Sequence, residues 1–211
     1  MAFWPPPPGA CGSTVLGVAF SPNGKLLASG GGDGTVRLWN LATGRLVTTL
    51  QTGTGPSTGV WGVAFSPDGK RLAGGCGNGV VWLWNLATGR LVARLHATTS
   101  TVYGAPAVAF SPGGKLLASG ELDGTVRAWN PATGQPVGAP IQTGSQNPVT
   151  WVAFSPDGKL LASLGGDGIV RLWQASLFTH AYAQLCADVG PPTPQEWNHY
   201  AIGEPQPKAC A

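Results

Sequence analysis

The sequence has few charged residues and few residues of the kinds that carry out chemistry. Only 10% of its 211 residues are charged, 12 Lys and Arg against 9 Asp and Glu, and it has three His and four Cys. So little charge excludes a solvated disordered chain, and a net charge of +3 without basic clusters argues against a nucleic-acid-binding protein. It lacks an apolar run of the roughly 18–20 residues that span a bilayer, and also a basic, apolar signal peptide. We expect a cytoplasmic protein without nucleic-acid or membrane partners.

Glycine and proline, in contrast, are abundant, with 33 and 19 residues that make up about a quarter of the chain. Without a period, this composition would indicate low complexity or disorder. The run Val-Ala-Phe-Ser-Pro, however, begins at Val18, Val63, Val108 and Val152, at spacings of 45, 45 and 44 residues. Because 43% of the residues are hydrophobic, a core is available. The period therefore assigns most glycines and prolines to repeated turns.

Each repeat has the pattern of short strands separated by turns. Val-Ala-Phe is followed by a Ser-Pro turn, then by Leu-Leu-Ala-Ser or a close variant, an Asp-Gly or Asn-Gly hairpin and a strand that ends in Trp. Ala-Thr-Gly then leads into a fourth strand in three repeats, over 46–50, 91–95 and 136–141. Each repeat is predicted to be a four-stranded antiparallel meander. The fourth repeat reaches only its third strand, which ends at Trp173.

These units resemble WD repeats, the blades of β-propellers. The resemblance covers about 11–174 and implies an all-β propeller of four-stranded antiparallel blades whose last blade is incomplete. The implied organisation is a Pro-rich segment at 1–10, repeats at about 11–55, 56–100, 101–144 and 145–174, and a C-terminal tail at 175–211. It also implies a non-catalytic scaffold that binds a protein or peptide partner and needs no cofactor.

In the WD family a His before the innermost strand shares buried hydrogen bonds with a Ser, the hairpin Asp and the Trp. The positions that correspond to this His are Cys11, Pro56, Thr101 and Ser145, so no repeat contains it. Most of the other members of this hydrogen-bonded set are present, and the resemblance implies a structural role for each of them. They are Ser29, Asp33, Trp39, Asn78, Trp84, Ser119, Asp123, Trp129, Ser163, Asp167 and Trp173. The second repeat has Gly74 in place of the Ser.

The sequence does not determine how the ring of blades closes. Prolines 5–8 leave only Ala2 to Trp4 to complete the last blade as a strand. An open arc would expose two apolar blade faces, at a cost on the order of 10 kcal/mol each. The alternatives are a closed four-bladed ring, a homodimer that closes an eight-bladed ring, and a fragment completed by another chain. We expect association rather than an open monomer.

The resemblance to WD repeats implies an interaction surface at one rim, formed by the loops that enter the innermost strands. These loops carry Trp61, Tyr103, Pro106 and Trp151, and exposed aromatic residues are typical interface anchors. Alternatively, Trp61 and Trp151 plug the central channel or pack between blades. Arg37, Arg127 and Arg171 are expected to be solvated strand residues, and Trp82, which replaces this Arg in the second repeat, is expected to be exposed.

No catalytic or metal site is predicted. The three histidines, His96, His180 and His199, stand outside any recognisable nucleophile motif. The repeated aspartates are explained by hairpin turns, and the cysteines and histidines lack the short spacing of a zinc site. We therefore expect that the chain is not an enzyme.

The tail has a different pattern. Apolar residues at helical spacing over 177–189, and a capping box at 193–196, predict one or two short helices. The tail resembles the C-terminal segment of large bacterial WD-repeat proteins, some of them signalling ATPases. An alternative function is therefore the sensor or regulatory C-terminal part of such a protein, or a degenerate repeat fragment. Cys186 and Cys210 are a possible disulfide in an oxidising compartment and free thiols in a reducing one.

Overall fold

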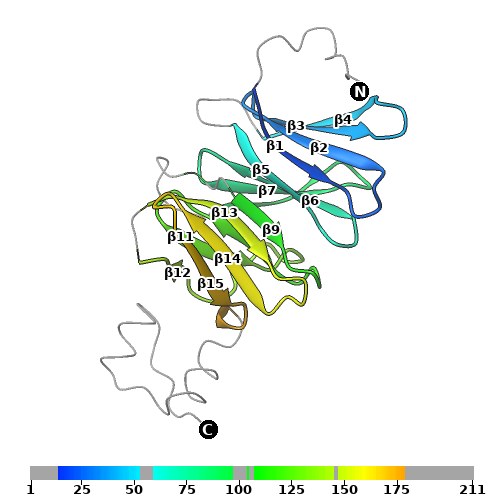
Figure 1. The fold of residues 1–211 in the computed structure, drawn as a ribbon. Helices are drawn as coiled ribbons and strands as arrows, with labels where there is room; N and C mark the ends of the chain where they lie inside the picture. The colour runs from blue at the N-terminus through cyan, green and yellow to red at the C-terminus, as the bar shows by residue number, and fades with distance from the viewer. Residues whose placement is uncertain (1–13, 53–58, 97–103, 105–106, 145–146, 179–211) are drawn as a thin grey trace, which may run out of the picture.

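A computed structural model describes residues 14–52, 59–96, 104, 107–144 and 147–178, and its regular structure is a series of four antiparallel sheets (Figure 1). Each sheet is called a blade here and is numbered in chain order. The predicted helices of the tail, the segment 1–10 and the pair Cys186 and Cys210 lie outside the described residues. In the part of the chain that the structure describes, no helix is long and apolar enough to cross a membrane.

The strands of each blade follow one another in sequence and pair with their neighbours. Blade 1 contains β1 (Val15–Phe20), β2 (Leu26–Gly31), β3 (Thr35–Asn40) and β4 (Leu46–Gln51). Blade 2 contains β5 (Val60–Phe65), β6 (Arg71–Cys76), β7 (Val80–Asn85) and β8 (Leu91–His96). Blade 3 contains β9 (Ala107–Phe110), β10 (Leu117–Gly120), β11 (Thr125–Trp129) and β12 (Ile141–Gln142). Blade 4 contains β13 (Val149–Phe154), β14 (Leu160–Gly165) and β15 (Val170–Gln174), so it has three strands in the described chain, as the sequence indicates.

The repeated Ser-Pro sequence forms the turn between the first two strands of each blade. In blade 2, Ser66 Oγ donates to Asp68 Oδ1 at 2.6 Å and accepts from the Arg71 amide at 2.9 Å. Gly69 closes this turn with a φ of 67°, a conformation that favours glycine. These hydrogen bonds account for the repeated serine without any nucleophilic role.

The outer strand of blade 3 is shorter than predicted. The sequence predicts a strand over 136–141, but only Ile141 and Gln142 form β12, and Pro136 makes an isolated bridge to Trp129. Two features between these contacts break the ladder: Gly138 has a φ of 67°, and Pro140 has no N–H to donate. The strand prediction was therefore wrong over 137–140.

Successive blades pack face to face through apolar side chains. The face of a blade that meets the preceding blade is called its front face, and the face that meets the following blade is called its rear face. Between blades 1 and 2, for example, Val36 and Leu38 on the rear of blade 1 lie in one core with Val63 and Phe65 on the front of blade 2. Two similar cores join blades 2 and 3, and blades 3 and 4.

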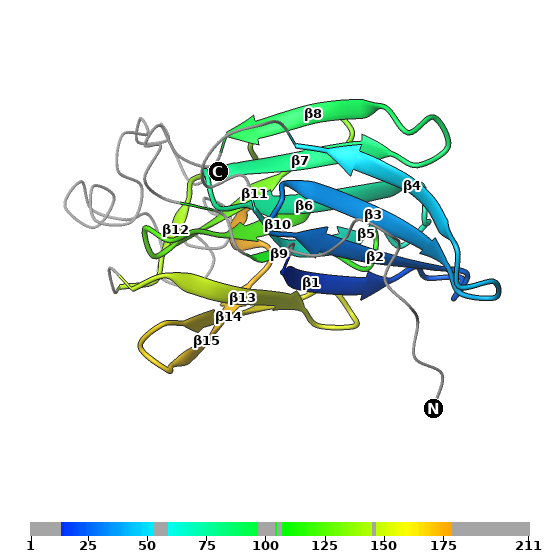
Figure 2. The same cartoon turned by 90° about the horizontal axis from the view of Figure 1, so that it is seen from above.

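Two blade faces are left uncovered at the ends of the series. On the front of blade 1, Val18 is 61% exposed and Phe20 is 68% exposed, whereas the equivalent Val63 and Phe65 are each 9% exposed. On the rear of blade 4, Leu172 is exposed, although its equivalents in blades 1 to 3 are buried. In Figure 2, blade 4 lies at one margin of the described molecule and β8 of blade 2 at the opposite margin. The described blades thus form an open series with two bare faces.

Candidate interaction surface and blade hydrogen bonds

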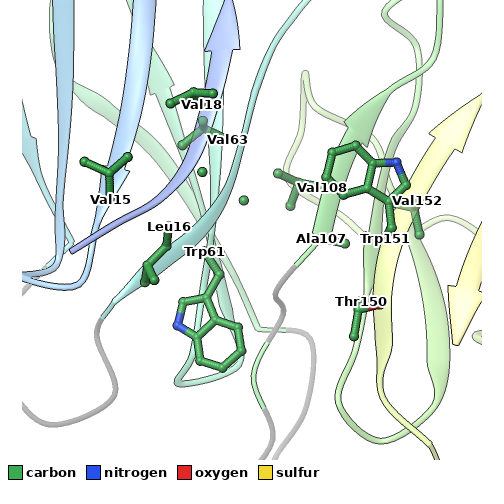
Figure 3. A pocket seen from close by; sticks show the side chains of 12 residues that line it. Val15, Leu16, Val18, Trp61, Val63, Ala107, Val108, Thr150, Trp151 and Val152 are labelled. Atoms are coloured by element: carbon green, nitrogen blue, oxygen red, sulfur yellow. The ribbon is translucent and has the colours of Figure 1, made fainter. Parts of the chain in front are cut away.

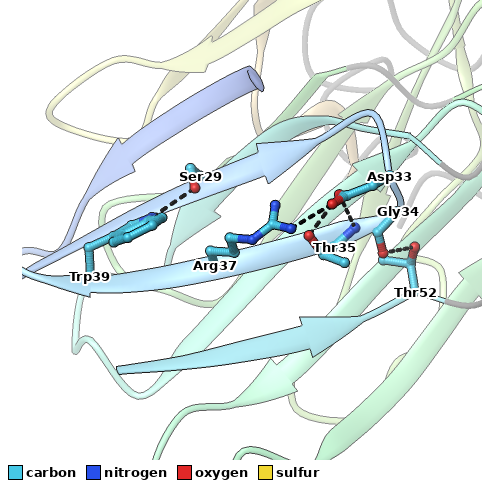
Figure 4. Close-up of polar contacts among 7 residues, drawn as sticks. All are labelled: Ser29, Asp33, Gly34, Thr35, Arg37, Trp39 and Thr52. Carbon is cyan, nitrogen blue, oxygen red and sulfur yellow. Dashed lines mark hydrogen bonds and ion pairs between the residues drawn. The ribbon is translucent and has the colours of Figure 1, made fainter. Parts of the chain in front are cut away.

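A Trp–Ser hydrogen bond recurs in three blades and joins the second strand to the third. In blade 1, Trp39 Nε1 donates to Ser29 Oγ at 2.9 Å (Figure 4). The same bond, also of 2.9 Å, joins Trp129 to Ser119 in blade 3 and Trp173 to Ser163 in blade 4. In blade 1 the residue directly opposite Trp39 is Leu27, and Ser29 lies two residues further along the same strand. The register is the same in blades 3 and 4, so each indole reaches diagonally across the ladder to its serine.

The hairpin aspartates form a second group of contacts. Asp33 Oδ1 accepts hydrogen bonds from the amide and hydroxyl of Thr35, and Asp33 Oδ2 accepts one from Arg37 at 2.6 Å (Figure 4). Burial alone would raise the pKa of Asp33, but the hydrogen bonds from Arg37 and Thr35 lower it below its usual value. Asp167 and Arg171 pair at 2.8 Å in blade 4.

These aspartate contacts were only partly anticipated. The hairpin role of the aspartates was predicted, but the arginines were expected to be solvated, and instead they pair with the aspartate four residues earlier. The third pair, Asp123 and Arg127, is looser, with 4.0 Å between its charged atoms. Each carboxylate therefore fixes a turn and a neighbouring cation, which is a structural role.

Blade 2 replaces these contacts with aromatic packing. A Cβ on Gly74 would lie 3.0 Å from the Trp84 ring, so the indole occupies the space where the other blades have a serine side chain. Trp82 stacks on Trp84 with ring centroids 6.2 Å apart, and the Arg94 guanidinium lies 4.5 Å from the Trp82 centroid. The hairpin residue Asn78 accepts from the Val80 amide at 3.2 Å.

The prediction that Trp82 is exposed was wrong. Trp82 is 7% exposed, and it lies in the core between blades 1 and 2. Arg94 on the adjacent outer strand covers its ring, a cation–π contact that the sequence of one strand alone does not reveal. Trp82 therefore does not contribute to an exposed aromatic surface.

Blade 3 contains a buried carboxyl group that was not predicted from the sequence. Glu121 is fully buried, and its Oε1 accepts a hydrogen bond from Ser119 Oγ at 2.6 Å, while Ser119 itself accepts from Trp129. Oε2 of Glu121 has no hydrogen-bond partner among the described residues. Burial raises the pKa of Glu121 to about 8, although Ser119 and Arg127 act in the opposite direction. The side chain is therefore mainly protonated at neutral pH.

A cavity of about 570 Å³ lies where the innermost strands of all four blades approach one another. The residues that line it come from β1, β5, β9 and β13, and every lining side chain is apolar except Thr150. Figure 3 shows Leu16 and Trp61 on one side of this space and Trp151 on the other. An apolar cavity with an aromatic residue from each of two blades suits an apolar side chain or segment better than a charged ligand.

Two of the four predicted rim residues line this cavity. Trp61 is 45% exposed and lies at a register shift of the β5–β6 ladder, between Val60 and Gly62, where β5 has one additional residue. Trp151 is 67% exposed and belongs to β13, opposite Leu164. The structure thus brings Trp61 and Trp151 to one cavity, and neither fills it. Tyr103 and Pro106 lie outside the described residues.

The described residues show little that would support metal or thiol chemistry. Among them there is no group of three or more His, Cys, Asp or Glu side chains able to hold a metal ion. Cys76 is buried, and burial raises the pKa of its thiol to about 12, which keeps it protonated and unreactive.

Antiparallel meanders that pack face to face around a common cavity define the class of propeller-like repeat proteins. Comparison with known families gives the same result, because the family described as "WD domain, G-beta repeat" matches residues 8–40, 44–85, 89–130 and 138–174. These matches cover more than half of the chain, which therefore belongs to the WD40 repeat family. WD40 repeats generally serve as non-catalytic scaffolds for protein–protein interaction.

A bacterial relative is also found. Over 47 residues the chain is 51% identical to an uncharacterised WD repeat-containing protein of Synechocystis sp.. The match spans 22% of this chain and 14% of the relative, so it covers about the length of one repeat.

Proposed function

We propose that this chain is a non-catalytic interaction module that binds an apolar segment of a protein partner at the mouth of the central cavity, with Trp61 as the main anchor. The observation that carries the proposal is the exposure of Trp61 and Trp151 at a cavity whose lining is almost entirely apolar. Exposed tryptophans beside a concave apolar surface are typical of the positions that dominate binding energy. The rim predicted from the sequence also includes Tyr103 and Pro106, which lie outside the described residues.

The size of the cavity limits the ligand to one or two side chains at a time. A space of about 570 Å³ accepts a Leu, Phe or Trp side chain with part of its backbone, but not a folded domain. Among the described residues no charged side chain lines the cavity, so specificity for an acidic or basic ligand is not expected. The proposed ligand is therefore an extended or turn segment with one or two large apolar residues.

Selection of a random peptide library against the full chain tests this function. Peptides that bind are expected to share aromatic or branched aliphatic residues and to lose binding to Trp61→Ala. Val47→Ala is a matched control, because Val47 is an exposed apolar residue on the outer strand β4, away from the cavity. Selection of charged peptides, or binding that survives Trp61→Ala, would count against the proposal.

A further inference from the structure

The rear face of blade 4 differs from the other rear faces at one cross-strand pair. In blade 1 the pair is Gly17 and Gly30, one from each of the first two strands. The equivalent pairs are Gly62 with Gly75 in blade 2 and Ala107 with Gly120 in blade 3. Blade 4 has Trp151 opposite Leu164. Blade 4 thus has two large apolar side chains where the other blades have glycine or alanine.

The small pair is a steric requirement for the way these blades stack. A Cβ on Gly30 would lie 2.6 Å from the Val60 carbonyl oxygen of blade 2. A Cβ on Gly120 would lie 2.6 Å from Val149 Cγ1 and 3.0 Å from the Val149 carbonyl oxygen of blade 4. The innermost strand of the next blade therefore approaches so closely that a side chain at this position meets its backbone, which cannot move aside as a flexible side chain can.

The rear face of blade 4 consequently cannot receive another blade in the same way. Val15 holds in β1 the position that Val60 holds in β5. If the bare front of blade 1 packed on blade 4 in the regular way, the backbone at Val15 would therefore collide with the Leu164 side chain. This steric conflict holds whether blade 1 belongs to the same chain or to a second copy. Regular head-to-tail packing, which would close a homodimeric ring, is therefore disfavoured.

The same face is strongly apolar. Its exposed large side chains are Trp151, Leu160, Leu164, Val170 and Leu172, and its strand residues carry no charge. At roughly 100 Å² each, these side chains amount to on the order of 500 Å², near the upper end for the largest apolar patch of a typical monomer. The area approaches the roughly 600–800 Å² that each partner buries in a standard interface.

We propose that the rear face of blade 4 is an interface between two copies of this chain, packed back to back about a twofold axis. Two identical faces without charge meet without electrostatic repulsion, and the bulky Trp151 and Leu164 that exclude a WD blade supply contact area in this arrangement. The inference goes beyond the proposed ligand site, because Val170 and Leu172 do not line the central cavity.

The test is the mass of the full chain by size-exclusion chromatography with light scattering over a dilution series. The unaltered chain is expected to be a dimer at micromolar concentration. Leu172→Lys is expected to weaken the dimer at least 100-fold, because the twofold axis would bring a buried charge from each copy into the interface. Val18→Lys is the matched control: it places the same charge on the other bare apolar face, the front of blade 1, and is expected to leave the dimer intact.

Three results would overturn the proposal. One is a monomer at 100 µM of the unaltered chain. Another is equal dissociation by Val18→Lys and Leu172→Lys, which would indicate head-to-tail packing. The third is a folded Leu172→Lys variant that remains dimeric. If circular dichroism shows that Leu172→Lys is unfolded, Trp151→Gln replaces it and is expected to weaken the dimer at least tenfold, because it removes the largest apolar side chain of the face from each copy. Peptide binding through Trp61 is measured separately, so failure of the dimer leaves the proposed ligand site open to its own test.

Discussion

Trp151 and Leu164 face each other across the β13–β14 ladder, at the position where Gly17 and Gly30 face each other in blade 1. Small residues hold this pair in the three blades that have a following neighbour, and large ones hold it in blade 4, which has none among the described residues. A small pair is therefore needed where another blade stacks on it, and the stability lost on substitution is expected to differ between blades.

Gly30→Ala is therefore expected to destabilise the protein more than Leu164→Ala at the equivalent register. The new Cβ would meet the Val60 carbonyl oxygen, and such overpacking typically costs about 1–3 kcal/mol in free energy of unfolding. Leu164 is on a bare face, so its truncation is expected to cost less than about 1 kcal/mol. Urea unfolding of both variants, at concentrations where the chain is monomeric, measures the difference. Equal losses would show that the small pair is not required for stacking.

Ser119→Ala is expected to cost more stability than Ser163→Ala. Ser119 accepts a hydrogen bond from Trp129 and donates one to Glu121, so its loss leaves two buried groups without that partner, at about 2–3 kcal/mol. Ser163 accepts a bond from Trp173, and its replacement is expected to cost about 1 kcal/mol. The comparison is made by thermal and urea unfolding of the two variants. A larger loss for Ser163→Ala would contradict the bridging role of Ser119.

Glu121 is expected to make stability depend on pH. Its pKa is about 8 in the folded chain, above its usual value of 4.5, so the folded state holds a proton that the unfolded state releases. The stabilising contribution is complete below about pH 4.5, decreases as the pH rises, and is lost above about pH 8, a change of a few kcal/mol.

Glu121→Gln separates this effect from the titration of other groups. Glutamine retains a side-chain hydrogen-bonding group and cannot ionise, so the variant is expected to gain stability relative to the unaltered chain as the pH rises from 4.5 to 8. The measurement is the difference in urea unfolding free energy between the two proteins across that range. A difference that is constant with pH would show that Glu121 does not remain protonated in the folded state.

The strands and turns were predictable from sequence because local chemistry determines them. Ser-Pro turns, Asx-Gly hairpins and Trp-ended strands recur at fixed spacing, and glycines such as Gly24 and Gly69 take the positive φ that these turns require. The exception in blade 3 also has a local cause, since Gly138 with its positive φ and Pro140 interrupt the outer strand.

Features that depend on a neighbouring strand or blade were harder to predict. The burial of Trp82 depends on Arg94 of the next strand, and the role of Glu121 depends on its contact with Ser119 in the folded blade. The rim residue Trp151 was identified from sequence, but its pairing with Leu164 requires the strand register. The repeats do carry a signal for this difference, because the two positions hold small residues in the other three repeats.

The central claim is that the cavity mouth binds an apolar segment through Trp61. It is tested most directly by calorimetry, which measures the affinity of one selected peptide for the unaltered chain, for Trp61→Ala and for Val47→Ala. Burying the exposed part of an indole is worth about 2–3 kcal/mol, so Trp61→Ala is expected to weaken binding roughly 30- to 150-fold. Val47→Ala and the unaltered chain are expected to bind equally. Equal affinity for all three proteins, with Trp61→Ala shown to be folded, would contradict the claim.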